Sequence, residues 1–209
     1  MLSPLQRRVA TILRDLPEAT GFALAGGAAL IVRGQISRLT LDLDYFAVDP
    51  TAVDLLLPVF VGAVRSAGLT VIEERVVPGF ARLSVADGPH QTGVDLATDA
   101  RLLPAEPSDV GLVLSAEELA VDKVLAIFGR AEARDFVDLA AVEPRFGLEH
   151  LCVLASRKDA GFSRSVFGSM LARFRRLDRD EFDVQDEVFD ATVEAVERWR
   201  SMLQDEGNG

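Results

Sequence analysis

The chain has 209 residues, 49% of them hydrophobic, with 22 basic and 33 acidic side chains and a formal net charge of −11. This apolar content describes a folded protein with a substantial core and excludes a disordered chain. The acidic balance argues against broad, non-specific nucleic-acid binding, which needs a positive field, but it is compatible with a local basic patch or a basic protein partner.

The sequence also bears on the compartment. It contains no run of about 18 charge-free apolar residues, so we expect no membrane span. The first residues, MLSPLQRRVATILRDL, interleave charges with apolar side chains and lack the apolar core of a signal peptide. Cys152 is the only cysteine, which excludes an internal disulfide. We therefore expect a cytoplasmic protein with no membrane partner.

The first half of the chain alternates helix-like and strand-like segments. Ser3 and Pro4 are typical of a helix start, and Pro58 should kink or split a later helix. In chain order, we expect a helix over 4–16, a strand over 22–25, a short helix over 28–33, a strand over 39–48, a helix over 51–67, and strands over 69–77, 80–86 and 93–98. This alternation predicts an α/β fold with a mixed sheet.

The second half of the chain is expected to be mainly helical. A loop is expected over 104–109, and Ser115 and Glu118 fit a capping box at the start of a helical region. Further helices are expected over 148–158, 163–176 and 185–203, and the last residues, 205–209, should fray. We therefore predict two domains: an α/β domain over 1–103 and an α-helical domain over 104–209.

The stretch from Phe22 to Phe46 carries the most informative residues. Asp42 and Asp44 are two apart on an expected strand, so their side chains share one face. Two adjacent carboxylates repel each other, and a hard divalent cation such as Mg²⁺, with Mn²⁺ as a substitute, would relieve the repulsion. An Asp-x-Asp pair also occurs on plain solvated strand faces. Its place in an ordered strand-helix-strand unit favours a metal-phosphate site.

Several nearby groups suit the phosphates of a nucleoside triphosphate (NTP). Backbone N–H groups at Gly26 and Gly27 can donate to phosphate oxygens. Thr40 adds a hydroxyl, and Arg38 or Arg33 could reach a triphosphate. Metal-bound carboxylates beside phosphate ligands indicate phosphoryl or nucleotidyl transfer with release of pyrophosphate.

Asp95 lies in a neighbouring expected strand and has two interpretations. It could be a third metal ligand, as a two-metal site requires. It could equally be a solvent-facing aspartate near a strand end.

Three charged residues of the helical half extend the pattern. Lys123 lies on a different helix face from the core candidates, and a lone lysine in this position is usually solvated. Asp135 and Asp138 are three apart and therefore neighbours on a helix surface. Asp135 could instead pair with Arg134 or Arg130 in a purely structural role.

The segments LAGGAALIVRGQISRLTLDLDYF and VDKVLAIFGRAEARDFVDL together resemble the AbiEii/AbiGii-type nucleotidyltransferase toxins, a branch of the polymerase-β-like nucleotidyltransferase superfamily. The resemblance covers roughly residues 20–48 and 115–142 and has no counterpart in the last third of the chain. It implies that Asp42 and Asp44 bind metal, that Lys123 contacts the nucleotide, and that Asp135 and Asp138 complete the catalytic site.

The resemblance also implies a biological role. Members of this family include toxins of bacterial toxin–antitoxin or phage-defence systems, some of which add nucleotides to the 3′ end of tRNA. A separate antitoxin protein is the expected partner. Two alternatives are nucleotidylation of a protein or small-molecule hydroxyl, and a non-catalytic interaction module on the same fold.

The last third of the chain carries a cluster of basic residues in an otherwise acidic protein, which is relevant to the identity of the molecule that accepts the nucleotide. Arginines gather there, and Arg173, Arg175 and Arg176 are its centre. The plain interpretation is a solvated face with salt bridges inside the protein. The functional interpretation is contact with the phosphates of a nucleic-acid strand.

Overall fold

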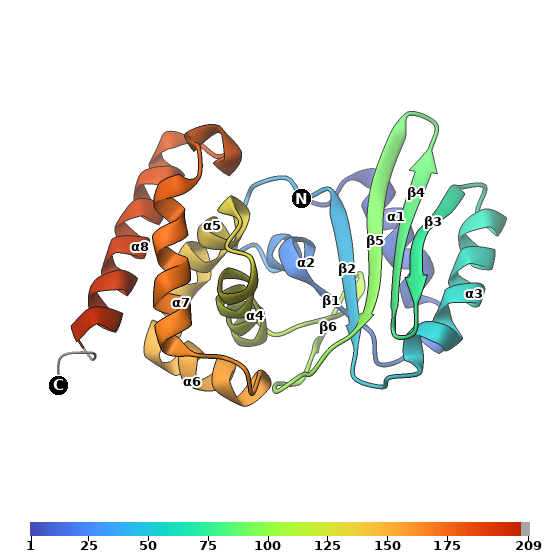
Figure 1. Cartoon of the computed structure of the whole chain (residues 1–209). Helices are drawn as coiled ribbons and strands as arrows, with labels where there is room; N and C mark the ends of the chain where they lie inside the picture. The colour runs from blue at the N-terminus through green and yellow to red at the C-terminus, as the bar shows by residue number, and fades with distance from the viewer. Residues whose placement is uncertain (206–209) are drawn as a thin grey trace. The chain divides into compact units, whose positions relative to one another are not determined.

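The computed structural model describes residues 1–205 and divides into two compact units (Figure 1). The first unit comprises Met1–Ser115, and the second begins at Ala116. The first is α/β and the second is built of helices. This division falls later in the chain than the boundary expected after residue 103, because two further strands join the sheet of the first unit.

A seven-stranded mixed sheet organises the first unit, in the order β3-β4-β5-β2-β1-β7-β6. The β2–β5 and β1–β7 pairs are parallel, and the other pairs are antiparallel. The sheet confirms the predicted α/β class. The strands are β1 (Ala23–Ala25), β2 (Asp42–Ala47), β3 (Thr70–Val77), β4 (Phe80–Asp87), β5 (His90–Thr98), β6 (Glu106–Ser108) and β7 (Gly111–Val113).

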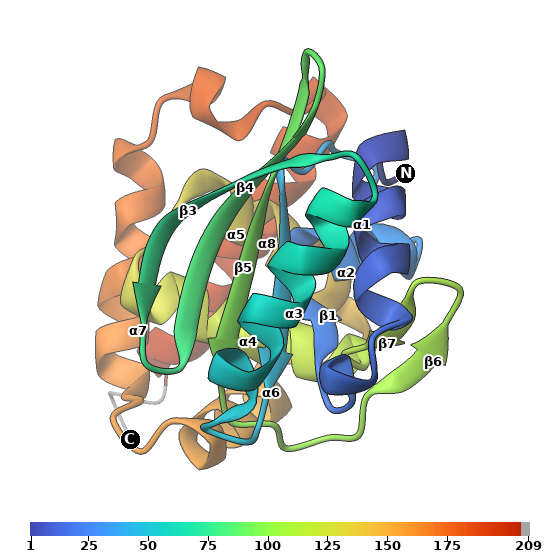
Figure 2. The same cartoon turned by 90° about the vertical axis from the view of Figure 1, so that its right-hand side faces the viewer.

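Helices α1 (Pro4–Arg14) and α3 (Ala52–Ser66) cover one face of this sheet (Figure 2). Alternate residues of the central strands, such as Leu43, Leu83 and Val94, are fully buried on that face. Helix α1 begins with the capping box of Ser3 and Gln6, in which each side chain accepts from the other residue's backbone N–H. Helix α3 runs through Pro58 without interruption, so the expected split does not occur.

The β6–β7 hairpin is the main departure from the expected elements. Residues 104–109 were expected to form a loop, but β6 pairs with β7, and Val113 of β7 aligns with Leu24 of β1. Each strand has only three residues, and β6 contains Pro107, which an edge strand tolerates because one side of its backbone needs no partner. Such short strands leave no alternation pattern in the sequence.

The second unit is a helical assembly around an aromatic core that includes Phe136, Phe167 and Trp199. Its α-helices are α4 (Ala116–Gly129), α5 (Ala133–Val142), α6 (Leu148–Lys158), α7 (Arg164–Leu171) and α8 (Asp186–Asp205). The helix expected over 163–176 ends at Leu171 and continues as a 3₁₀ turn, Ala172–Arg176. The end of the expected frayed tail, 206–209, lies outside the described residues. None of the described helices has the length and apolarity needed to cross a membrane.

Candidate active site

The two acids of the Asp-x-Asp motif share one face of β2, as the sequence predicted. Asp42 and Asp44 are half-buried and alternate with the buried Leu43 and Tyr45. Strand β2 lies between β5 and β1, and Asp44 aligns with Ala25, the last residue of β1. The chain leaves β1 at Gly26, where the short helix α2 (Gly26–Val32) begins. The Gly-Gly turn therefore adjoins the acids.

Each acid packs against a glycine. Gly26 has φ of +60°, and the carboxylate of Asp44 occupies the space that a Cβ atom on Gly26 would need. Gly93 of β5 aligns with Asp42, and the carboxylate of Asp42 occupies its Cβ position in the same way. Any larger residue would displace a carboxylate, so the two glycines give both acids their positions close to the backbone.

Arg38 and Thr40 lie beside Gly27. A Cβ atom at Gly27 would be 2.7 Å from Nη2 of Arg38 and 3.4 Å from Oγ1 of Thr40. The side-chain amide of Gln6 donates to the carbonyl of Thr40 at 2.9 Å and so ties this segment to α1. Arg33 is engaged elsewhere, since its Nε donates to the carbonyl of Leu114 at 2.6 Å. Of the two arginines considered from the sequence, Arg38 is therefore the one that lies beside the Gly-Gly turn.

Asp95 also lies on this face, aligned with Asp44. Both of its carboxylate oxygens accept from Arg82 of β4, at 2.9 Å from Nε and 2.5 Å from Nη2. This hydrogen-bonded pair raises the pKa of Arg82. Within residues 1–205, no group of three His, Cys, Asp or Glu side chains is arranged to hold a metal ion. Because Asp95 is engaged by Arg82, Asp42 and Asp44, which share one face of β2, are the acids on this face that could hold a divalent cation.

In the second unit, Lys123 of α4 meets both acids of α5. Its Nζ lies 2.8 Å from Oδ2 of Asp138 and 3.3 Å from Oδ1 of Asp135. Both aspartates are 0% exposed and Lys123 is 6% exposed. Three charges buried together are stable only when they neutralise and hydrogen-bond one another. The plain interpretation of Lys123 as a solvated surface lysine therefore does not hold, since Lys123 is held inside an ionic cluster.

Arg130 completes this cluster at Asp135. Its Nε and Nη2 donate to the two oxygens of Asp135 at 2.9 and 3.0 Å. Burial raises the pKa of Asp135, but the hydrogen bond from Arg130 and the charges of Lys123 and Arg130 outweigh burial, so the net pKa is lowered. Arg134, the other partner considered from the sequence, instead pairs with Glu132.

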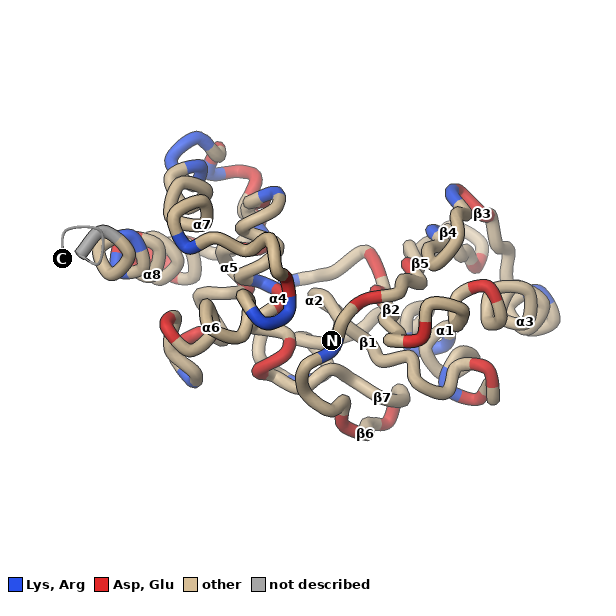
Figure 3. The backbone as a smooth tube through the Cα atoms, turned by 60° about the horizontal axis from the view of Figure 1, so that its bottom comes forward, with Lys and Arg blue, Asp and Glu red and all other residues tan. Residues whose placement is uncertain are grey.

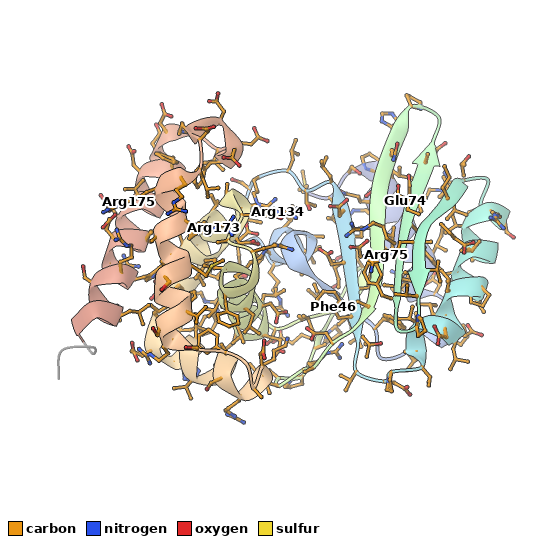
Figure 4. All side chains as sticks on the ribbon, in the orientation of Figure 1. Phe46, Glu74, Arg75, Arg134, Arg173 and Arg175 are labelled. Carbon is orange, nitrogen blue, oxygen red and sulfur yellow. The ribbon has the colours of Figure 1, made fainter. Side chains whose placement is uncertain are left out.

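The basic residues of the last third lie in the 3₁₀ turn that follows α7. Arg173, Arg175 and Arg176 are all exposed, and Arg175 lies 3.1 Å from Glu197. Figure 3 marks basic segments next to α7, and Figure 4 labels Arg173 and Arg175. Among residues 1–205, no carboxylate lies within ion-pair distance of Arg173 or Arg176, and the side chains of all three arginines are exposed to solvent.

A family model described as the nucleotidyl transferase AbiEii toxin of a type IV toxin–antitoxin system matches residues 9–205. The chain belongs to the AbiEii family. It is therefore a nucleotidyltransferase, and the resemblance seen in its motifs is confirmed. No curated protein sequence matches this AbiEii chain.

Two solved structures share the fold of this AbiEii chain. JHP933 from Helicobacter pylori is 19% identical with a TM-score of 0.56, and the match covers 100% of this chain and 97% of JHP933. MenT4, a nucleotidyltransferase toxin from Mycobacterium tuberculosis, is 18% identical with a TM-score of 0.51, covering 95% of this chain and 92% of MenT4. At these identities the similarity shows the fold alone.

The structure of this AbiEii chain contains a second buried lysine that sequence reasoning missed. Nζ of Lys158 donates to Glu118 at 2.8 Å and to Asp122 at 2.5 Å, and so joins the end of α6 to α4. Glu118 and Asp122 are four apart on α4, which could have indicated a shared partner. The partner itself lies 36 to 40 residues away, and the sequence pattern does not specify that separation.

Proposed function

We propose that this nucleotidyltransferase is a Mg²⁺-dependent enzyme that transfers a nucleotide from an NTP to the 3′ end of tRNA. The observation that carries the proposal is the placement of Asp42 and Asp44 on one face of β2, next to the Gly26–Gly27 turn, in a chain of the AbiEii family. Carboxylate oxygens are preferred Mg²⁺ ligands, and Mg²⁺ is commonly bound together with substrate phosphates. Mn²⁺ could replace it.

In the proposed reaction, the 3′ hydroxyl of the acceptor attacks the α-phosphorus of the NTP. A new P–O bond forms, the hydroxyl proton is released to water, the bond between the α-phosphorus and the oxygen that bridges to the β-phosphate breaks, and pyrophosphate leaves. Asp42 and Asp44 would hold Mg²⁺, which supplies a charge that stabilises the leaving pyrophosphate and favours ionisation of the hydroxyl. Gly26, Gly27, Arg38 and Thr40 would bind the triphosphate through backbone N–H groups, a guanidinium and a hydroxyl.

We assign Lys123 a contact with the nucleotide, with Asp135 and Asp138 holding its ammonium group in place. Two carboxylates within 3.3 Å of Nζ support this role, because they fix the position of the ammonium group. The exposed residues Arg173 and Arg176, with Arg175, would contact the phosphate backbone of tRNA. Since Asp95 is held by Arg82, Asp42 and Asp44 would be the two acids that bind Mg²⁺. Asp95 would become a third ligand only if its carboxylate left Arg82.

The proposed biological role is growth inhibition by modified tRNA, relieved by an antitoxin. The type IV toxin–antitoxin family of this chain supports an antitoxin partner. MenT4, which shares the fold, is named as a nucleotidyltransferase toxin. The proposed cytoplasmic location follows from the tRNA acceptor.

The proposal is tested by incubating the protein with Mg²⁺ and each of the four NTPs, labelled at the α-phosphate, together with total tRNA. Label on tRNA that disappears with EDTA and with Asp42→Asn supports it. A parallel reaction with tRNA-free lysate tests the alternative, because label on protein would identify a protein hydroxyl as the acceptor. If no NTP is consumed and Asp42→Asn still inhibits growth, the chain acts as a non-catalytic module.

A further inference from the structure

The face of the sheet that carries the acids extends well beyond them, over β5, β4 and β3. Residues aligned across neighbouring strands point to the same face. From Asp44, one aligned row runs through Asp95 and Arg82 to Arg75. The adjacent row consists of Phe46, Ala97, Phe80 and Val77. Because α1 and α3 cover the opposite face, these two rows form a surface on the side of the acids, where Figure 4 labels Phe46 and Arg75.

The first row contains two arginines, of which one forms an ion pair and the other does not. Arg82 is fixed by Asp95, yet its side chain is 54% exposed. Arg75 is exposed, and among residues 1–205 no carboxylate lies within ion-pair distance of it. Asp95 pairs with only one of the two guanidinium groups, and Glu74 also acts electrostatically on Arg82, so Arg75 is the arginine of this row whose guanidinium has no ion-pair partner among the described residues. The side chain of Arg82 is held in place before any ligand arrives.

The second row places aromatic rings beside these charges. The guanidinium carbons of Arg75 and Arg82 lie 5.6 and 5.9 Å from the ring centroid of Phe80. Phe80 and Phe46 are both partly exposed, and they are two strands apart, or roughly 10 Å at the usual strand spacing. Aromatic rings interleaved with arginines are typical of surfaces that bind single-stranded nucleic acid by stacking bases and contacting phosphates.

The position of this surface relative to the acids indicates which substrate it serves. Gly27, Arg38 and Thr40, the proposed triphosphate ligands, lie beside the end of β1, whereas the residues of the two rows beyond Asp44 and Phe46 lie on the β5 side of β2. In displacement at phosphorus, the attacking and leaving oxygens are roughly in line on opposite sides of the phosphorus atom. An acceptor whose hydroxyl attacks opposite the leaving pyrophosphate would therefore approach over β5.

We propose that Arg75, Arg82, Phe46 and Phe80 form an acceptor platform, which holds the single-stranded end of a nucleic acid. The phenylalanine rings stack on its bases, and the arginines contact its phosphates. Asp95 is a positioning residue that orients Arg82. This inference deepens the proposed function, on which it rests, by placing acceptor binding on the sheet of the first unit and giving Asp95 a role other than metal ligation.

The test measures binding without turnover. The probe is a 12-nucleotide single-stranded RNA with a 5′ fluorophore and a 3′-deoxy end, which has no 3′ hydroxyl to react, and binding is followed by fluorescence anisotropy at several salt concentrations. Arg75→Glu should weaken binding about tenfold and reduce the salt slope by about 1. Phe80→Leu, which keeps an apolar side chain and removes the ring, should weaken binding at least about fivefold. Thermal melting confirms that each variant is folded.

The matched control is Arg65→Glu, the same charge change at an exposed position of α3, on the helix layer over the opposite face. It should bind RNA like the wild type. NTP binding, measured as thermal stabilisation with Mg²⁺, should be unchanged in Arg75→Glu. The platform is overturned if the wild type does not bind the RNA, if Arg65→Glu and Arg75→Glu weaken binding equally, or if Arg75→Glu weakens only NTP binding. Failure of nucleotide transfer appears in the labelling assay instead, so the two hypotheses fail separately.

Discussion

The carboxylate of Asp44 fills the space where Gly26 would carry a side chain. The Gly-Gly turn and the Asp-x-Asp motif are separated in the sequence, but in the fold they are in direct contact, and a side chain at position 26 would clash with Asp44. Gly26 also has φ of +60°, a conformation that other residues adopt with strain. Because the proposed chemistry depends on where that carboxylate points, the glycine is expected to matter for activity as well as for folding.

Gly26→Ala should reduce nucleotide transfer at least tenfold, because the new methyl group displaces the Asp44 carboxylate. The matched control is Gly34→Ala, since Gly34 has φ of +66° but nothing within 4 Å of its Cβ position. Both variants should lose about 1–3 kcal/mol of unfolding free energy from backbone strain, measured by urea denaturation. Only Gly26→Ala should lose activity. Equal activity in the two variants would show that the contact with Asp44 is unimportant.

Asp42→Asn should abolish transfer without destabilising the fold. If Asp42 holds Mg²⁺, losing that ligand removes several kcal/mol of transition-state stabilisation, or roughly 10²- to 10³-fold in rate. In the absence of metal, the substitution relieves repulsion with Asp44 on the same strand face, so the melting temperature in EDTA should stay the same or rise. Mg²⁺ should raise the melting temperature of the wild type and not of the variant. A variant that retains transfer, or that unfolds in EDTA, contradicts a metal-binding role.

The sequence could predict the half of the site that depends on local geometry. The two-residue period of a strand places Asp42 and Asp44 on one face, and the three-residue helical spacing makes Asp135 and Asp138 neighbours. Neither rule indicates what a side chain meets across the fold. The pairing of Asp95 with Arg82 follows from the β4–β5 register, and burial of Lys123 follows from the packing of α4 on α5. The fold class was predictable from alternating elements, whereas the three-residue strands β6 and β7 were not.

Lys123→Met should destabilise the protein by about 3–5 kcal/mol, because Asp138 and Asp135 would remain buried without their shared cation. Arg134→Met is the control: this arginine pairs with Glu132 at the surface, where an ion pair contributes about 1 kcal/mol or less. The measurement is the urea midpoint of each variant. Similar losses in both variants would show that the buried cluster adds little to stability.

The depressed pKa of Asp135 makes the second unit sensitive to acid. A carboxyl whose pKa is lower in the folded than in the unfolded state stabilises the fold above its unfolded pKa, and that stabilisation is lost as the pH falls through the folded value. The unfolding free energy should therefore decline as the pH is lowered from about 5. Asp135→Asn does not titrate at this position, so its decline should be less steep, although its stability at pH 7 is lower.

Urea denaturation between pH 7 and pH 3 measures the two slopes, and Asp54→Asn, which removes the same charge from an exposed position on α3, controls for net charge. A carbon-13 titration of the Asp135 carboxyl in the wild type gives an independent reading, with an expected midpoint below the ordinary aspartate value of 3.8. A midpoint above 3.8 would mean that burial outweighs Arg130 and Lys123. In that case the cluster would gain a proton on folding, and its stabilising effect would grow as the pH falls.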